Sequence, residues 1–183
     1  MQYTKINNRR YLGNKYRLLP FITNVIANEC GHFSSFADVF AGTGAVSSAF
    51  IDKKIITNDI LYSNYLCHLT WFSNEPHDIK KIENYIEYFN SDLSYEENYM
   101  TENFSNTYFS DVVCSRIGYV REFIENEFVN GKINLKEKAM LITSLLYGLD
   151  KIANTCGHYD AFRKNVELSS SLVLSVPSPN NDL

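Results

Sequence analysis

The sequence lacks the features that would place the protein in a membrane or outside the cell. No stretch approaches the roughly 18 consecutive apolar residues that cross a bilayer. The residues after Met1 do not form the charged start and apolar run of a signal peptide. We therefore expect a soluble cytoplasmic protein that has no contact with a membrane.

The sequence also lacks cysteine in any arrangement that binds zinc or forms a disulfide framework. Its four cysteines are isolated, with no C-x-x-C pair (Cys30, Cys67, Cys114 and Cys156). Zinc sites and disulfide-rich folds need paired or regularly spaced cysteines, so neither is indicated and no metal is expected. Isolated thiols usually behave as small hydrophobic side chains, which is how we interpret these four.

An excess of positive charge is missing as well. The net charge is −4, which weighs against a nucleic-acid binder, because phosphate neutralisation needs clustered Lys and Arg. The charge is unevenly spread, however, since residues 1–17 carry only basic charged side chains (Lys5, Arg9, Arg10, Lys15 and Arg17). A basic arm on an acidic body can present a local positive face, so global charge does not decide the matter.

The first third of the chain alternates between expected helices and strands. The 183 residues are enough for one domain with a proper core and leave little room for a second. We expect a helix over 15–29, a strand over 35–40, a short helix over 45–51 and a strand over 54–58. This order predicts a β-α-β unit with a parallel sheet, and hence an α/β fold class.

The remaining two thirds read as mostly helical. Apolar residues recur at helical spacing over 79–89, 113–124 and 136–152, and we interpret these stripes as helix surfaces that face the core. Residues 91–111 are polar and aromatic and predict a long loop, a feature that is often functional in a compact domain. Residues 172–176 offer one further strand.

The residues with the clearest chemistry follow the first expected strand. Residues 36–44 read F-A-D-V-F-A-G-T-G, and a strand that runs into a Gly-x-Gly turn lets a ligand approach bare backbone. In an open α/β sheet such a turn lies at the carboxyl end of the strand, where ligands bind. The second strand ends at Asp59, where a carboxylate can accept hydrogen bonds from the hydroxyls of a ribose. An ordinary strand-to-helix turn remains the alternative, because Ser47 replaces the third glycine of a dinucleotide fingerprint.

A second cluster lies upstream, at residues 10–15 (R-Y-L-G-N-K). By itself it reads equally as a turn before a helix, in which Gly13 and Asn14 interrupt regular structure and Lys15 is solvated. Its position before the glycine turn gives it more weight.

Together these elements resemble adenine-N6 DNA methyltransferases of the Dam type. In that family an aromatic-x-Gly-x-Lys element comes first, followed by a Leu-rich helix, F-x-D-x-F-x-G-x-G and an acid at the end of the next strand. Here Tyr11, Gly13 and Lys15 match the first element, Phe36, Asp38, Phe40, Gly42 and Gly44 match the second, and Asp59 matches the acid. The resemblance covers about residues 8–62.

The resemblance implies a partial Rossmann-like S-adenosylmethionine-dependent methyltransferase fold with a mostly helical insert. Residues 1–75 would be the cofactor-binding α/β part, and residues 76–183 the target-recognition part. Lys15 would lie near the cofactor carboxylate or the catalytic acid. The implied S-adenosylmethionine-binding residues are Tyr11, Gly13, Lys15, Asp38, Phe40, Gly42, Gly44 and Asp59.

Residues 150–164 look like the region that leads to catalysis in relatives fused to or paired with restriction enzymes. A polar, aromatic and basic run after a buried helix can contact double-stranded DNA, with Arg163 and Lys164 on phosphates and His158 and Tyr159 on bases. A self-contained loop in which His158 caps or packs is an equal alternative.

The sequence departs from the family at one decisive motif. The family's [DNS]-P-P-[YFW] tetrapeptide appears nowhere, and the late prolines are Pro177 and Pro179, in V-P-S-P-N. That tetrapeptide supplies the acceptors for the adenine N6 amino group and the aromatic that stacks on the flipped base. We therefore assign no catalytic residue. We expect a truncated or split form that is inactive by itself, with a second chain as a candidate source of the segment.

Two alternatives stay open. The first is another nucleoside-cofactor enzyme, such as a small-molecule methyltransferase or an oxidoreductase, which would not need the cluster at 10–15. The second is a non-catalytic cofactor- or DNA-binding subunit of a methyltransferase or restriction-modification system. Cofactor binding without turnover would indicate that subunit.

Overall fold

The structure is a computed structural model that describes residues 3–4, 6, 13, 15–91, 96–156 and 159–178. Two predicted site residues, the cofactor contact Tyr11 and the DNA contact His158, lie outside these ranges.

The N-terminal part forms a small β-α-β unit. Its elements are the 3-10 turn η2 (Tyr16–Leu18), helix α1 (Leu19–Cys30), strand β2 (Ser35–Asp38), helix α2 (Ala45–Ser48) and strand β3 (Lys54–Thr57). Strands β2 and β3 pair in parallel, with Ser35 opposite Lys54 and Asp38 opposite Thr57. The predicted strand and helix order is therefore confirmed, although α2 and both strands are shorter than expected.

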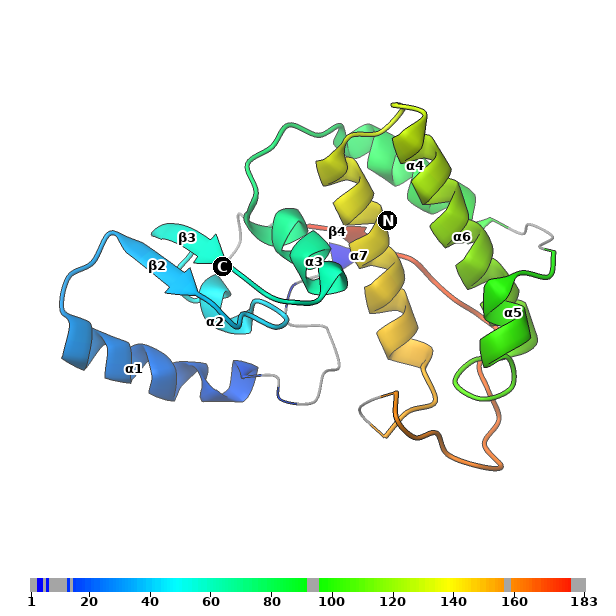
Figure 1. Cartoon of the computed structure of the whole chain (residues 1–183), viewed down its shortest axis with the longest axis horizontal. Helices are drawn as coiled ribbons and strands as arrows, with labels where there is room; N and C mark the ends of the chain where they lie inside the picture. Colours follow the sequence, from blue (N-terminus) through cyan, green and yellow to red (C-terminus); the bar gives the residue numbers. More distant parts are fainter. Residues whose placement is uncertain are drawn as a thin grey trace.

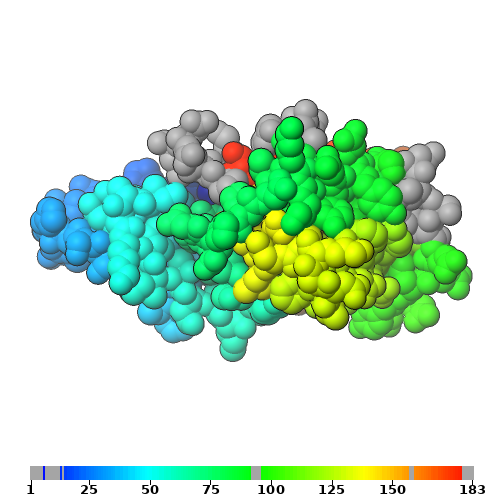
Figure 2. All heavy atoms as spheres, turned by 90° about the horizontal axis from the view of Figure 1, so that it is seen from above, coloured from blue at the N-terminus to red at the C-terminus, as the bar shows by residue number. Residues whose placement is uncertain are grey.

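The rest of the described chain is dominated by helices. These are α3 (Tyr62–Phe72), α4 (Ile79–Asn90), α5 (Tyr99–Phe104), α6 (Asp111–Val129) and α7 (Leu135–Ile152). Figure 1 shows the β-α-β unit at one end of the molecule and α4 to α7 at the other, with α3 between them. The molecule is elongated, as Figure 2 also shows. Within the described ranges, no helix combines the length and apolar character needed to cross a membrane.

The main core lies among α4, α6 and α7. Ile82, Ile86 and Phe89 of α4 are buried against the apolar faces of the other two helices. The predicted core-facing stripes of these three helices are therefore confirmed, except that Ile79 at the start of the first is 40% exposed. The side of the molecule formed by the β-α-β unit is packed less: no residue of α1 is buried, and Phe40 and Ile60 are 87% and 97% exposed.

The start of α7 buries charged side chains. Lys136 is 2% exposed, and its Nζ donates to the carbonyl oxygens of Leu69, Thr70 and Ser73 at the end of α3. Glu137 forms a capping box with Asn134 and accepts from Lys81. Such buried charges persist because each has several partners. They tie α7 to both α3 and α4.

The prediction of a long loop over 91–111 is wrong over residues 99–104, while residues 96–98 and 105–110 lie outside helices. Residues 99–104 form helix α5, which begins with a capping box between Asn98 and Thr101. Ser105 and Phe109 then form a parallel bridge. The helix is too short to show an apolar period, so only its capping residues signal it.

The strand expected over 172–176 is also mostly wrong. Only strand β4 (Val176–Pro177) forms, and it pairs in parallel with β1 (Tyr3–Thr4). Before it, the side chain of Asn90 bonds both the backbone N–H and the carbonyl of Leu174. This amide takes the place of a neighbouring strand and satisfies an extended segment that packs on α7.

Candidate functional site

The turn between β2 and α2, residues 39–44, is the centre of the candidate site and is called here the glycine loop. Its backbone is anchored to the end of β3: the N–H of Ala41 donates to the carbonyl of Asn58 at 3.0 Å, and Asn58 Nδ2 donates to the carbonyl of Val39 at 3.0 Å. Gly42 and Gly44 have φ values of 54° and 81°, a region that glycine adopts without strain. The loop therefore has the conformation that the Gly-x-Gly pattern predicts.

A pocket of about 340 Å³ lies against the glycine loop. Its wall includes five of the predicted cofactor residues: Gly13, Lys15, Asp38, Phe40 and Gly42. Gly13 and Lys15 are far from the others in sequence, so folding brings the two predicted clusters together. Gly44 does not line the pocket; it is the N-cap of α2, between the lining residues Thr43 and Ala45.

Asp59 is bonded to the glycine loop as well as to the chain that follows it. Its Oδ2 accepts from the N–H of Gly42 at 2.8 Å, and its Oδ1 accepts from Leu61 N and Asn64 Nδ2, each at 3.0 Å. Burial alone would raise the pKa of Asp59, but these donors outweigh it and the pKa is lowered. The side chain is therefore a carboxylate at neutral pH.

Asp38 also has a hydrogen-bond partner, in helix α2. Ser47, which stands where a dinucleotide fingerprint has its third glycine, is fully buried and donates to Asp38 Oδ2 at 3.0 Å. The serine thus fixes the acid at the end of β2. This explains in structural terms why Ser47 is accommodated at that position.

Sequence reasoning missed three residues of α3 that face the glycine loop. Asn64 bonds Asp59, the Nε2 of His68 lies 2.8 Å from the carbonyl oxygen of Gly42, and the ring of Phe72 lies against Gly44. They are spaced by four residues and so share one face of the helix. The detectable signal is the N-x-x-x-H-x-x-x-F pattern that begins five residues after Asp59.

Three of the predicted DNA-binding residues, Tyr159, Arg163 and Lys164, lie among the described residues, in the loop after α7. Arg163 and Lys164 are exposed, and half of the Tyr159 side chain is exposed. Two side chains bond the backbone of this loop: Asn154 Nδ2 donates to the carbonyl of Arg163, and the Tyr108 hydroxyl donates to the carbonyl of Tyr159. Both acceptors are backbone carbonyls of the loop, so these bonds do not use the side chains of Arg163 and Lys164.

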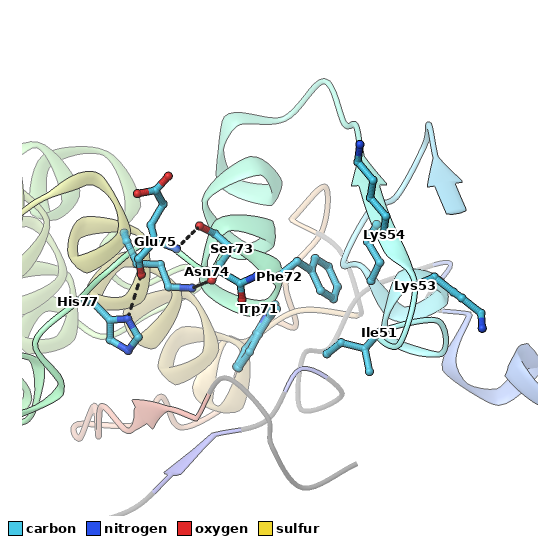
Figure 3. Close-up of a pocket in the computed structure, with 11 residues that line it drawn as sticks. Ile51, Lys53, Lys54, Trp71, Phe72, Ser73, Asn74, Glu75 and His77 are labelled. Atoms are coloured by element: carbon cyan, nitrogen blue, oxygen red, sulfur yellow. Dashed lines mark hydrogen bonds between the residues drawn. The ribbon is translucent and has the colours of Figure 1, made fainter. Parts of the chain in front are cut away.

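A second pocket, of about 570 Å³, separates β3 from the end of α3 (Figure 3). Several of its polar side chains form local hydrogen bonds with the neighbouring backbone: Ser73 accepts from the N–H of Glu75, and His77 Nδ1 bonds the carbonyl of Glu75. Lys53 pairs with Asp52 at 2.8 Å. No set of residues with a shared chemical task gathers here, so the smaller pocket at the glycine loop is the candidate site.

The comparison with known families gives the class of this protein. Residues 11–174 match the model of the D12 class N6 adenine-specific DNA methyltransferases. The chain belongs to this family. The match covers the glycine loop, Asp59, α3 and the loop after α7, well beyond residues 8–62. Membership confirms the predicted adenine-specific family and argues against the alternative of an unrelated nucleoside-cofactor enzyme.

Several curated proteins are similar to this chain. The type II methyltransferase M.NlaIII of Neisseria lactamica is 33% identical over 175 residues, which cover 91% of this chain and 52% of that protein. The modification methylase LlaI of Lactococcus lactis subsp. lactis is 32% identical over 171 residues, covering 85% of this chain and 27% of that protein. M.FokI of Planomicrobium okeanokoites is 30% identical, with 85% and 27% covered. The chain thus spans between a quarter and about half of these relatives. No solved structure matches it.

Proposed function

We propose that this chain forms the cofactor-binding and target-recognition part of an enzyme that methylates adenine N6 in double-stranded DNA with S-adenosylmethionine. Family membership supports the reaction class. The observation that carries the proposal is the pocket itself, in which Gly13 and Lys15 meet Asp38, Phe40 and Gly42. In this proposal residues 1–75 bind the cofactor, within a partial Rossmann-like methyltransferase fold, and residues 76–183 read the target.

The residues around the pocket fit this cofactor. A volume of about 340 Å³ lies within the range of small-molecule sites. Among the described residues, Asp59 Oδ2 accepts one hydrogen bond, and a carboxylate oxygen has room for a second, which a ribose hydroxyl can fill. Lys15 is exposed at the pocket wall and offers an ammonium group to the cofactor carboxylate. When bound, the cofactor supplies a methyl group on a sulfonium; the chain binds, orients and shields it.

The loop after α7 is the proposed DNA contact. Arg163 and Lys164 would neutralise phosphates, while Tyr159 offers a half-exposed ring to a base. His158 belongs to the same proposal. The target adenine would leave the duplex, because its N6 is inaccessible to a methyl donor inside the stack.

The acceptor groups for the N6 amine are proposed to come from outside these 183 residues. No [DNS]-P-P-[YFW] tetrapeptide is present in the sequence. Further residues of a longer protein, or a second chain, would supply it. By itself this chain is then expected to bind the cofactor without turnover.

Titration calorimetry with S-adenosylmethionine tests the cofactor half of the proposal. Asp59→Ala should weaken binding by about 1–3 kcal/mol, the scale of hydrogen bonds to a charged group. Lys15→Ala should also weaken it, without affecting folding, because the side chain is exposed.

Asp52→Asn is the matched control. Asp52 is an exposed acid whose ion pair is with Lys53. Neither Asp52 nor Asp59 lines the pocket itself, but Asp59 bonds the N–H of the pocket residue Gly42, and among the described residues Asp52 makes no such bond. Its variant should bind like the wild type. If the folded wild type does not bind at millimolar ligand, the chain does not form the cofactor site as proposed.

A further inference from the structure

Both backbone polar groups of Gly42 have a side-chain hydrogen-bond partner. Its N–H donates to Asp59 Oδ2 at 2.8 Å, and its carbonyl oxygen lies 2.8 Å from His68 Nε2. A carbonyl can only accept, so the imidazole must carry its proton on Nε2. Asn64, one turn earlier on α3, holds the other oxygen of Asp59. The result is a closed set of hydrogen bonds that links α3, Asp59 and the glycine loop.

His68 is well placed to hold the loop rigidly. The residue is 4% exposed, so its bond to Gly42 is shielded from water. Burial lowers the pKa of His68, partly offset by the Gly42 carbonyl and by the charges of Asp59 and Asp38. The imidazole is therefore neutral at pH 7. Its ring also lies beside Phe72, which packs against Gly44.

Other side chains of α3 fix the helix to the helical part of the molecule. Thr70 and Thr143 of α7 share a hydrogen bond of 2.9 Å, and the rings of Trp71 and Tyr147 meet edge to face at 5.6 Å. Lys136 caps the last carbonyls of the helix. The position of His68 is thus set by contacts that lie outside the β-α-β unit.

We propose that His68 is a positioning residue for the cofactor site: by donating Nε2–H to the Gly42 carbonyl, it fixes the peptide that lines the pocket. The proposal rests on the proposed function only for the identity of the ligand. Its structural content is that the amides of the glycine loop are protected because His68 holds them, whether or not a ligand is present.

Two readouts on the same purified chain test this proposal. Hydrogen exchange without ligand should show the amides of Ala41, Gly42 and Gly44 exchanging about tenfold faster in His68→Leu, which keeps bulk but has no donor. Calorimetry should show S-adenosylmethionine binding about 5- to 10-fold more weakly in the same variant. His68→Gln, whose amide can donate from a similar position, should restore both to within about twofold of the wild type.

Thr143→Val is the matched control on the other face of α3. It removes the bond to Thr70, whose hydroxyl still donates to the carbonyl of Leu66, and the bond of 3.7 Å to Cys67 Sγ. It should lower stability without changing loop exchange or affinity. The proposal is overturned if His68→Leu exchanges like the wild type, if His68→Gln fails to rescue, or if Thr143→Val has the same loop effect. If the exchange of the loop amides depends on His68 but the chain does not bind S-adenosylmethionine, only the proposed function is rejected.

Discussion

Gly44 is a position of the glycine loop at which we expect a substitution to be poorly tolerated. Its φ is 81°, and a Cβ added there would lie 2.9 Å from Cε2 of Phe72. Gly44→Ala therefore combines backbone strain with a steric clash, and we expect it to lower the free energy of unfolding by about 2–4 kcal/mol. Urea unfolding followed by circular dichroism measures this loss.

Gly131→Ala measures the cost of backbone strain without a steric clash. Gly131 has a φ of 71°, but nothing lies within 4 Å of a Cβ added there. Its alanine variant should lose only the strain of a left-handed residue, about 1–2 kcal/mol. Equal losses at the two positions would mean that Phe72 moves aside freely and does not constrain the loop.

At the scale of a single element, the start of α7 depends on Glu137. Its carboxylate accepts from the N–H of Asn134, the N–H of Asp78 and the ammonium of Lys81. Burial alone would raise the pKa of Glu137, but these donors outweigh burial and lower it. Glu137→Gln has one acceptor oxygen in place of two, so we expect a loss of about 1–3 kcal/mol at pH 7.

The pH dependence of this loss has a definite sign. A lowered pKa in the folded state adds stability above the unfolded value, and that stability disappears as the pH falls through the folded pKa. The difference between wild type and Glu137→Gln should therefore shrink below roughly pH 4. Asp52→Asn, at an exposed ion pair, should show no comparable loss at pH 7. A gap that stays constant down to pH 3 would contradict a charge-based role.

At the scale of the whole molecule, an acidic chain must present its basic groups locally to bind DNA. Replacing both Arg163 and Lys164 with alanine should weaken binding to duplexes of any sequence. It should also reduce the slope of log affinity against log salt by about 1.8, or 0.9 for each lost phosphate contact. Fluorescence anisotropy over a series of salt concentrations measures this slope.

The matched control removes two exposed basic residues elsewhere, Lys80 on α4 and Arg121 on α6. It makes the same change in net charge, so a general electrostatic effect would appear in both variants. If the two double variants have the same salt slope, the loop after α7 does not contact phosphates.

Local patterns in the sequence were sufficient for the mixed α/β character of the fold and for the glycine loop at the candidate site. The apolar periods of α4, α6 and α7 are long enough to be read directly, and the Gly-x-Gly turn can be recognised because few other residues tolerate its φ values. Helix α5 and the segment before β4 were misread. One is too short for a period, and in the other the backbone of Leu174 bonds the side chain of Asn90 in place of a neighbouring strand.

Only the tertiary structure decided which side chains hold the site in place. Asn64, His68 and Phe72 have no local signature stronger than a helical spacing, and their roles follow from packing α3 between the glycine loop and α7. The burial of Lys136 and Glu137 has the same origin, because a charge can be buried only where distant backbone and side-chain partners meet it. The sequence by itself determined the glycine loop and indicated the family, since those depend on neighbouring residues. The support of that loop depends on residues that folding alone brings together.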